Sequence, residues 1–227
     1  MKSDKSAESV KKTLKYSAYS EIKKRILSCE YAPGAMLSEE VLCADTGTSR
    51  TPVRDALSRL EQESLITIVP KKGILVRDVT LELVNAVYEA RLLIEPYSLE
   101  RYGAKIDPND ILRFYDETRH LITEEHDIKT DLELDDKIHS VIVNASVNAY
   151  LVATYASLQA QNQRLRVMSG RTLQNRIQTS DEEHLHILTY CLKRDWQNAA
   201  LQLTQHLSNA KDASFQLLVD RLAKVKA

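Results

Sequence analysis

The chain has 227 residues, with 31 Lys and Arg against 32 Asp and Glu, 43% apolar side chains, and only 5 Gly, 5 Pro and 3 Cys. This composition excludes collagen-like, disulfide-stapled and wholly disordered proteins. No stretch approaches the roughly 18 to 20 apolar residues of a membrane-spanning helix, and the polar start of the chain does not resemble a signal peptide. We therefore expect a cytoplasmic globular protein whose cysteines are reduced core residues, built as one large domain or two smaller ones.

The near-zero net charge conceals two parts of opposite charge. Residues 1–77 carry 14 Lys and Arg against 10 Asp and Glu, whereas residues 78–227 carry 17 against 22. Gly and Pro are sparser in the second part, which favours long uninterrupted helices there. These shifts predict a flexible arm at 1–15, a first domain at 16–78 that suits a negatively charged partner, and a second domain at 79–227.

The first domain is predicted to begin with two helices. The spacing of apolar residues over 19–27 indicates one buried helical face, in a helix that ends near Ser28. After a Pro-Gly turn, Ser38 opens a short second helix. Gly47 fits the left-handed backbone position after its end.

The third helix of this domain carries the residues of most interest. Ser49 is placed to cap its start, and Pro52 fits the first turn, where no amide donor is needed. Its predicted buried stripe consists of Val53, Ala56, Leu57 and Leu60. Arg50, Thr51 and Arg54 then project outward, so the second and third helices form a helix-turn-helix, whose second helix lies in a DNA major groove.

A basic hairpin is predicted to follow. Residues 65–76 read as two short strands joined by a turn that contains Lys71, Lys72 and Gly73, with both lysines facing phosphate. An exposed Arg or Lys is usually just a solvated side chain. Three helices, a polar recognition start and a basic wing in fixed order are, however, typical of a DNA-binding winged helix.

The second domain is predicted to be entirely helical. Six amphipathic stretches cover it, at about 80–104, 107–126, 130–144, 147–168, 177–193 and 195–224. No strand pattern competes with them, so we expect an antiparallel bundle of six helices. The whole chain is then mainly α, with an N-terminal winged helix-turn-helix domain and a C-terminal all-α bundle.

Four side chains of the second domain form a candidate metal site. Asp135 and His139 are four residues apart and share one helical face. His184 and His206 lie equally far from a predicted helix turn at residues 194–195, which places them at the same height of an antiparallel pair. Three imidazoles and a carboxylate suit a divalent transition metal, with zinc, nickel and manganese as candidates.

Other interpretations of this cluster stay open. A helical histidine is often only a packed or surface residue, which is how we interpret His120, His126 and His186. The metal could also be purely structural, or it could activate water in a hydrolase or isomerase with an accessory basic domain. Against an enzyme, the sequence offers no HExxH motif, no Gly-rich phosphate loop and no clear general base.

The first domain resembles the DNA-binding domain of the GntR superfamily of bacterial transcription regulators. The similarity runs from Pro33 to Val76 and includes the segment SRTPVR. It implies operator contacts by Ser49, Arg50, Thr51, Arg54 and Gly73. Two positions depart from the family pattern: Glu40 stands where some relatives carry a DNA-contacting Arg, and Ser64 replaces a common Gly.

The second domain resembles the FCD effector domain of the FadR branch, and its six helices suggest the shorter VanR-like type. All four metal-ligand positions of the metal-binding members are filled here, by Asp135, His139, His184 and His206. The resemblance implies that the metal helps to hold a small carboxylate effector, with Arg91 as a candidate carboxylate partner. An ion pair between Arg91 and Glu95, one helical turn on, is an equally strong alternative.

Together these patterns predict a regulator rather than an enzyme. We expect a homodimer that binds a pseudo-palindromic operator in double-stranded DNA, with Arg50 or Arg54 reading guanine edges. Lys71 and Lys72 would neutralise phosphates. The helical domain would dimerise, bind a metal and sense a small organic acid.

Overall fold

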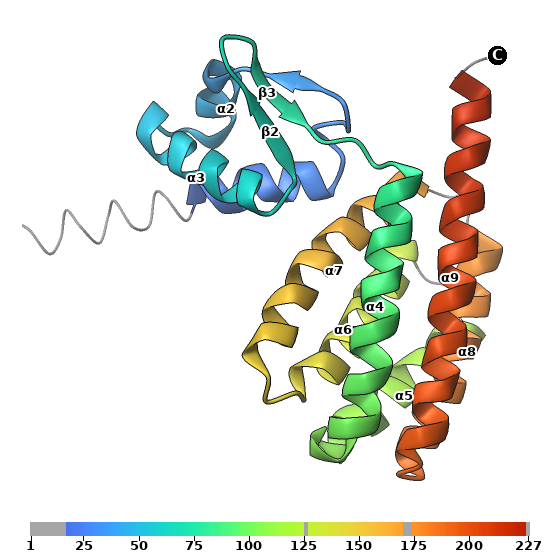
Figure 1. The fold of residues 1–227 in the computed structure, drawn as a ribbon. Coiled ribbons are helices and arrows are strands. Elements are labelled where there is room, and N and C mark those ends of the chain that lie inside the picture. The colour runs from blue at the N-terminus through green and yellow to red at the C-terminus, as the bar shows by residue number, and fades with distance from the viewer. Residues whose placement is uncertain (1–16, 125–126, 170–173, 226–227) are drawn as a thin grey trace, which may run out of the picture. The chain divides into compact units, whose positions relative to one another are not determined.

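The computed structural model describes residues 17–124, 127–169 and 174–225 (Figure 1). They form two compact units. The first holds residues 17–79 together with 163–168, and the second holds the remaining described residues. The predicted arm at 1–15 lies outside the described residues.

The first unit contains helices and a small antiparallel sheet. Its elements are a helix over described residues 17–27, β1 (Met36–Leu37), α2 (Glu39–Thr46), α3 (Arg50–Gln62), β2 (Ile66–Val69) and β3 (Gly73–Val76). The predicted stripe of α3 is buried and packs with Ile22, Ile26, Leu42 and Leu65 in one apolar core. This arrangement confirms the winged helix-turn-helix.

The short strand β1 was missed by the sequence analysis. It is only two residues long, so it shows no alternation of apolar and polar residues that a pattern could detect. It pairs with β3 through Met36 and Leu75, which gives a sheet with the strand order β1-β3-β2. Gly73 is needed at this point, because its φ is 127° and a Cβ there would lie 2.5 Å from the Leu37 carbonyl oxygen.

The predicted ends of α2 are confirmed, and the start of α3 differs in one detail. The Ser38 side chain accepts a hydrogen bond from the Val41 amide, and Gly47 has the expected left-handed φ of 62°. Ser49 occupies the N-cap position of α3, but its side chain makes no capping hydrogen bond.

Apart from residues 163–168 of α7, which belong to the first unit, the second unit contains the six predicted helices: α4 (Leu81–Tyr102), α5 (Pro108–Thr123), α6 (Ile128–Asn144), α7 (Ala149–Ser169), α8 (Gln174–Leu192) and α9 (Trp196–Val225). A short 3-10 turn, Gly103–Lys105, follows α4. The predicted ranges are right to within a few residues. The helix α8 begins at Gln174, three residues before the predicted start at residue 177.

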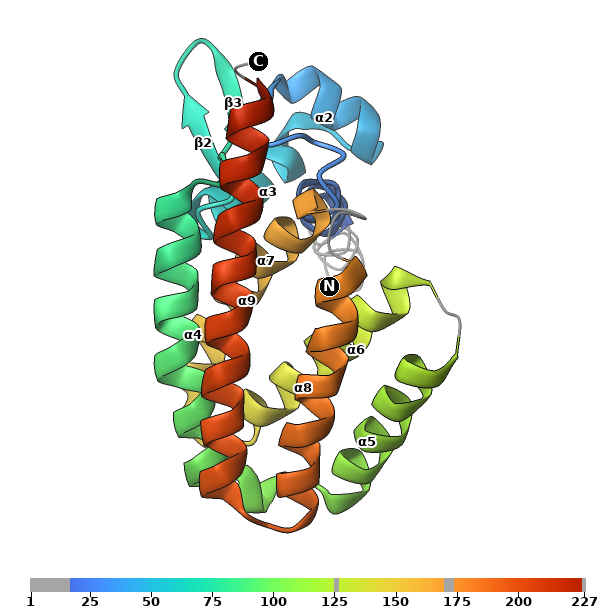
Figure 2. The ribbon, with the colours of Figure 1, turned by 90° about the vertical axis from the view of Figure 1, so that its right-hand side faces the viewer.

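The helices of the second unit pack as an antiparallel bundle. Figure 2 shows α4, α9, α8 and α5 side by side, with α6 crossing behind them. Their shared core includes Leu99, Phe114, Ile138, Ile187 and Leu203. The remaining helix, α7, packs through Tyr155 against Ile94 of α4 and Val143 of α6.

Two further expectations from the sequence can be compared with the structure. None of the described helices is both long and apolar enough to cross a membrane. The three cysteines, all within the described residues, form no disulfide, and only Cys191 is buried. Cys29 and Cys43 are half-buried, so the prediction of core cysteines is right for Cys191 alone.

Candidate functional site

The outward side of α3 presents the polar residues that the sequence singled out. Ser49, Arg50, Thr51 and Arg54 are all exposed, and the side chains of the two arginines are 65% and 64% exposed. The opposite side of the helix is held in the apolar core. The first turns of α3 therefore offer two cationic side chains on a rigid support.

Both arginines face an acidic residue at the start of α2. Arg54 Nε donates to the two carboxylate oxygens of Glu39, at 2.9 and 3.1 Å, and these hydrogen bonds lower the pKa of Glu39. Arg50 Nη2 lies 3.7 Å from Glu40 Oε1. Exposed pairs of this kind contribute little stability, so they can be exchanged for contacts to a phosphate or a base edge.

The wing adds a second group of cations. Lys71 and Lys72 are exposed in the turn between β2 and β3, and Lys71 has a left-handed φ of 63°. A hollow of about 550 Å³ lies between α3 and this turn, and its lining includes Arg54, both lysines and Gly73. The predicted DNA-contacting residues thus gather around one depression.

In the second unit, four side chains from three helices converge. Asp135 and His139 come from α6, His184 from α8 and His206 from α9. The three imidazoles are buried, and one ligand atom of each residue lies within 4.8 Å of those of the other three. Because α8 and α9 are antiparallel, His184 and His206 face each other with ring centroids 4.4 Å apart.

The distances between these ligand atoms suit a first-row metal ion. His139 Nε2 lies 3.2 Å from His206 Nε2 and 3.3 Å from His184 Nε2. Two nitrogens bound tetrahedrally at the usual zinc distance of about 2.0–2.1 Å are about 3.3 Å apart. Asp135 Oδ1 lies 3.8 Å from His139 Nε2 and 3.6 Å from His184 Nε2. The residues present therefore fit a divalent ion.

Two carboxylates, one buried and one half-buried, hold two of the imidazoles in place. Glu95 Oε2 lies 2.5 Å from His139 Nδ1, and Glu183 Oε2 lies 2.7 Å from His206 Nδ1. Each contact places a proton on Nδ1 and leaves the Nε2 lone pair directed at the centre of the cluster. The sequence analysis named Glu95 only as an ion-pair partner of Arg91 and did not single out Glu183, so the contacts of both glutamates with the imidazoles are findings of the structure.

The electrostatics of the cluster follow from burial. Burial and the neighbouring His206 lower the pKa of His184 well below its usual value, and burial also lowers the pKa of His206 despite its bond to Glu183. Burial raises the pKa of Glu95, but Arg91 and His139 outweigh this effect and lower it to about 2. Neutral imidazoles and ionised carboxylates are the forms that bind metals.

Arg91 occupies a buried position beside this cluster. Its Nε donates to Glu95 Oε1 at 2.6 Å, and its side chain is only 4% exposed. Since Glu95 also contacts His139, the ion pair that the sequence analysis kept as an alternative is part of the support of the cluster. The structure leaves its role towards an effector as a prediction.

The remaining histidines do not join the four-residue group. His120 is exposed and contacts Glu124 at 3.1 Å, and His186 is exposed on α8. His126 lies outside the described residues.

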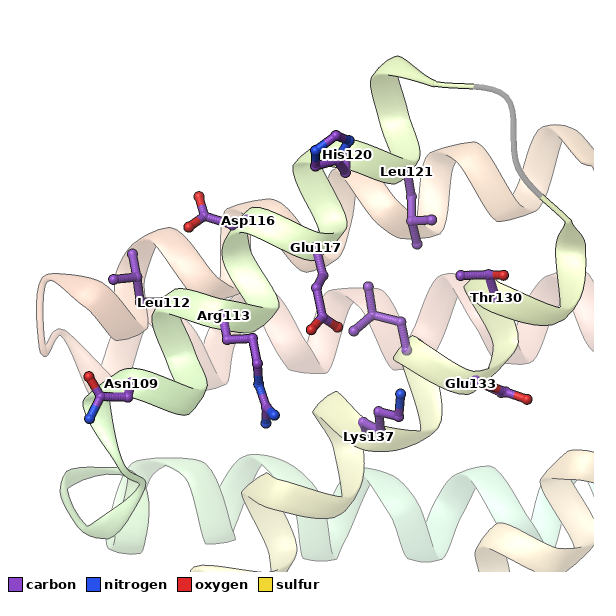
Figure 3. A pocket seen from close by; sticks show the side chains of 11 residues that line it. Asn109, Leu112, Arg113, Asp116, Glu117, His120, Leu121, Thr130, Glu133 and Lys137 are labelled. Carbon is purple, nitrogen blue, oxygen red and sulfur yellow. The ribbon is translucent and has the colours of Figure 1, made fainter.

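A separate hollow of about 650 Å³ lies between α5 and α6. Figure 3 shows Arg113 and Glu117 of α5 and Lys137 of α6 pointing into it, with Asp116 directed away. None of the four clustered residues lines this hollow, and its mixed charges are typical of a solvated surface groove.

Comparison with known proteins identifies both units. Residues 14–76 match the bacterial regulatory proteins of the gntR family, and residues 86–209, more than half of the chain, match the FCD domain. A transcriptional regulator from an unstable DNA locus of Streptomyces ambofaciens is 32% identical over 65% of this chain, a stretch that spans 63% of that protein. The Nta operon transcriptional regulator of Aminobacter aminovorans is 27% identical over 85% of this chain and 90% of its own length.

Solved structures share the fold. Escherichia coli McbR/YncC superposes with a TM-score of 0.74 at 18% identity, over 89% of this chain and 97% of that chain. The Zn²⁺-bound FCD domain of TM0439 superposes with a TM-score of 0.54 at 20% identity, over 62% of this chain and 96% of that domain. The chain belongs to the GntR family of bacterial regulatory proteins that carry an FCD domain, and it is a regulator and not an enzyme.

Proposed function

We propose that the protein is a homodimeric transcription regulator of the cytoplasm that binds a pseudo-palindromic operator. The observation that carries this proposal is the pair of exposed arginines on α3 beside a basic wing. The first turns of α3 enter the major groove, where Arg50 or Arg54 reads a guanine edge. Ser49, Thr51 and Gly73 contact the backbone, and Lys71 and Lys72 neutralise phosphates.

Apolar side chains exposed on α4 support the dimer. Leu93 and Tyr97 are one helical turn apart and are 71% and 52% exposed. Large apolar groups that stay in contact with water on one helical face favour association with a second copy. Two copies related by a two-fold axis would present two α3 helices to the two half-sites of an operator.

Operator binding by alanine variants tests the DNA-binding part. We expect Arg50→Ala to weaken specific binding by about 1–3 kcal/mol, because a bidentate contact to guanine is lost. Lys72→Ala should mainly reduce the salt dependence of binding, because one phosphate contact is lost. The slope of the logarithm of the binding constant against the logarithm of the salt concentration should fall by about one. Fluorescence anisotropy with a selected operator at several salt concentrations measures both. If Arg50→Ala and Arg54→Ala both bound the operator as tightly as the wild type, the proposed placement of α3 in the major groove would be wrong.

We further propose that Asp135, His139, His184 and His206 hold a divalent transition metal. Zinc is the first expectation, and nickel and manganese are alternatives because the same ligands accept them. The spacing of the Nε2 atoms and the two carboxylates behind the imidazoles support this assignment. A bound ion would supply positive charge, and a coordination number above four would leave room for an anionic oxygen beside the four protein ligands.

The proposed effector is a small organic acid that uses this charge, with Arg91 as the arginine that the family resemblance suggests. The acid can change operator binding only if it has different affinities for two states of the dimer. If the metal is instead only a structural staple, chelation lowers the melting temperature while added acids change nothing. Thermal melts with and without chelator, across a panel of acids, separate the two.

A further inference from the structure

Arg176 is a second cationic side chain attached to the four-residue cluster. It lies in the first turn of α8, about two helical turns before His184. Its Nη2 donates to Glu183 Oε2 at 2.9 Å, and the same oxygen lies 2.7 Å from His206 Nδ1. One carboxylate oxygen thus connects Arg176 directly to an imidazole of the cluster.

One nitrogen of the Arg176 guanidinium stands out. Nη1 is buried and has no hydrogen-bond partner among the described residues, although the side chain as a whole is 16% exposed. A buried donor without an acceptor is destabilising, and more so when the group is charged. Such a nitrogen marks a position where an acceptor from a ligand fits, and the fixed fork of an arginine matches a carboxylate best.

The two arginines beside the cluster differ in how they are held. Arg91 pairs through Nε with Glu95, and both side chains are almost fully buried. The Glu183 carboxylate, in contrast, accepts hydrogen bonds from His206, Asn209 and Arg176. The Nη2 atom of Arg176 is therefore fixed by Glu183, whereas Nη1 finds no acceptor in the described part of the chain.

The charges around the cluster favour a bound anion. Among the groups linked to the cluster by the contacts above, a divalent ion bound by neutral imidazoles, together with Arg91 and Arg176, would carry one more positive charge than Asp135, Glu95 and Glu183. In a buried site this excess is weakly screened. A single carboxylate neutralises it, whereas a highly charged anion would exceed it.

We propose that Arg176 is a carboxylate-binding residue of the effector site, an inference that rests on the proposed metal-anchored acid effector. Nη1 donates to an oxygen of a small organic acid, while Nη2 stays on Glu183. Because Glu183 also orients His206, a bound acid is linked through Arg176 to one of the four metal ligands. The ligand class is a small monocarboxylic acid in its ionised form.

Calorimetric titration of the full-length, zinc-loaded protein tests this role. The probes are glycolate, lactate and gluconate, with lactamide as an uncharged control. Arg176→Gln keeps a donor for Glu183 but removes the charge, so we expect the Kd for the acid that binds to rise about 10- to 100-fold. The matched control is Arg113→Gln, which removes a 57% exposed arginine that pairs with Asp110, and it should bind the acid like the wild type. Zinc content is measured on every sample.

The possible results distinguish a failure of the proposed Arg176 role from a failure of the proposed metal-anchored effector. If Arg176→Gln holds zinc and binds the acid as tightly as the wild type, Arg176 has no role in the effector site, while the metal-anchored effector stands. If the zinc-loaded wild type binds none of the acids, both fail. If Arg176→Gln loses zinc, the acid affinity of Arg176→Lys is measured instead. We expect it to be lower than that of the wild type, because one ammonium cannot replace a guanidinium that bonds to Glu183 and to the acid at the same time. Wild-type acid affinity in that variant would contradict the inference.

Discussion

At His139 and His206, the two nitrogens of each ring have separate partners. Nδ1 contacts a carboxylate, which is fully buried in Glu95 and 17% exposed in Glu183, and the two Nε2 atoms lie 3.2 Å apart. The three imidazoles are packed closely, and a cation at their centre would be coordinated by their Nε2 atoms. This arrangement is what the proposed metal site requires of its ligands.

The contact between Glu183 and His206 gives a prediction for metal affinity. We expect Glu183→Gln to weaken metal binding by about 10- to 100-fold, because an amide orients the imidazole less strongly and lowers its basicity. Competition titration with a chromogenic chelator measures the change. The control is Glu182→Gln, which alters the exposed neighbouring residue and should leave the affinity unchanged. Equal affinities in the two variants would show that the Glu183 contact does not tune the metal.

Arg91 gives a second prediction at this scale, about stability. Its removal leaves Glu95 buried, with a carboxylate that has lost its cationic partner. We therefore expect Arg91→Ala to lower the free energy of unfolding of the metal-free protein by about 3–5 kcal/mol, as for other broken buried pairs. Urea unfolding measures this loss. A variant that is as stable as the wild type but no longer responds to acids would instead assign Arg91 to the effector alone.

Among the structural elements, the end of α3 departs from the family pattern in a way that the structure explains. Ser64 stands where the family commonly has Gly, and its φ is 59°, in the left-handed region that costs a non-glycine residue about 1–2 kcal/mol. The Leu65 amide bonds to the Leu60 carbonyl at 3.0 Å, so this conformation closes the helix. The strained residue lies between the end of α3 and the start of β2.

Relief of this strain should stabilise the first unit. We expect Ser64→Gly to raise the free energy of unfolding by about 0.5–1 kcal/mol, because the greater freedom of glycine in the unfolded chain offsets part of the gain. Differential scanning calorimetry of the two proteins would show a higher melting temperature. A lower melting temperature would mean that the Ser64 side chain contributes more than the strain costs.

The elements also show what periodicity could and could not predict. The equal distance of His184 and His206 from residues 194–195 was sufficient to bring them together, because helix rise and an antiparallel turn fix the register. The contact between Glu95 and His139 could not be predicted, since it depends on how α4 packs against α6. Likewise β1 exists only through its pairing with β3.

On the scale of the whole molecule, two units with different chemistry are joined in one chain. The first presents cations on its surface, and the second encloses a buried cluster of imidazoles and carboxylates. The division was visible in the sequence as opposite charge and as the change from turns to long helices. How a bound acid alters operator affinity was not, because coupling depends on the difference between two states of the assembled dimer.

The most direct test of the account is metal analysis of the full-length protein after zinc loading and dialysis, with His184→Ala beside the wild type. We predict one zinc ion per chain in the wild type and a loss of at least about tenfold in affinity in the variant, since one of four ligands is removed. The wild type should also melt at a higher temperature with zinc than after chelation. A wild type that retains no metal, or a variant that retains it equally, would contradict the assignment of Asp135, His139, His184 and His206.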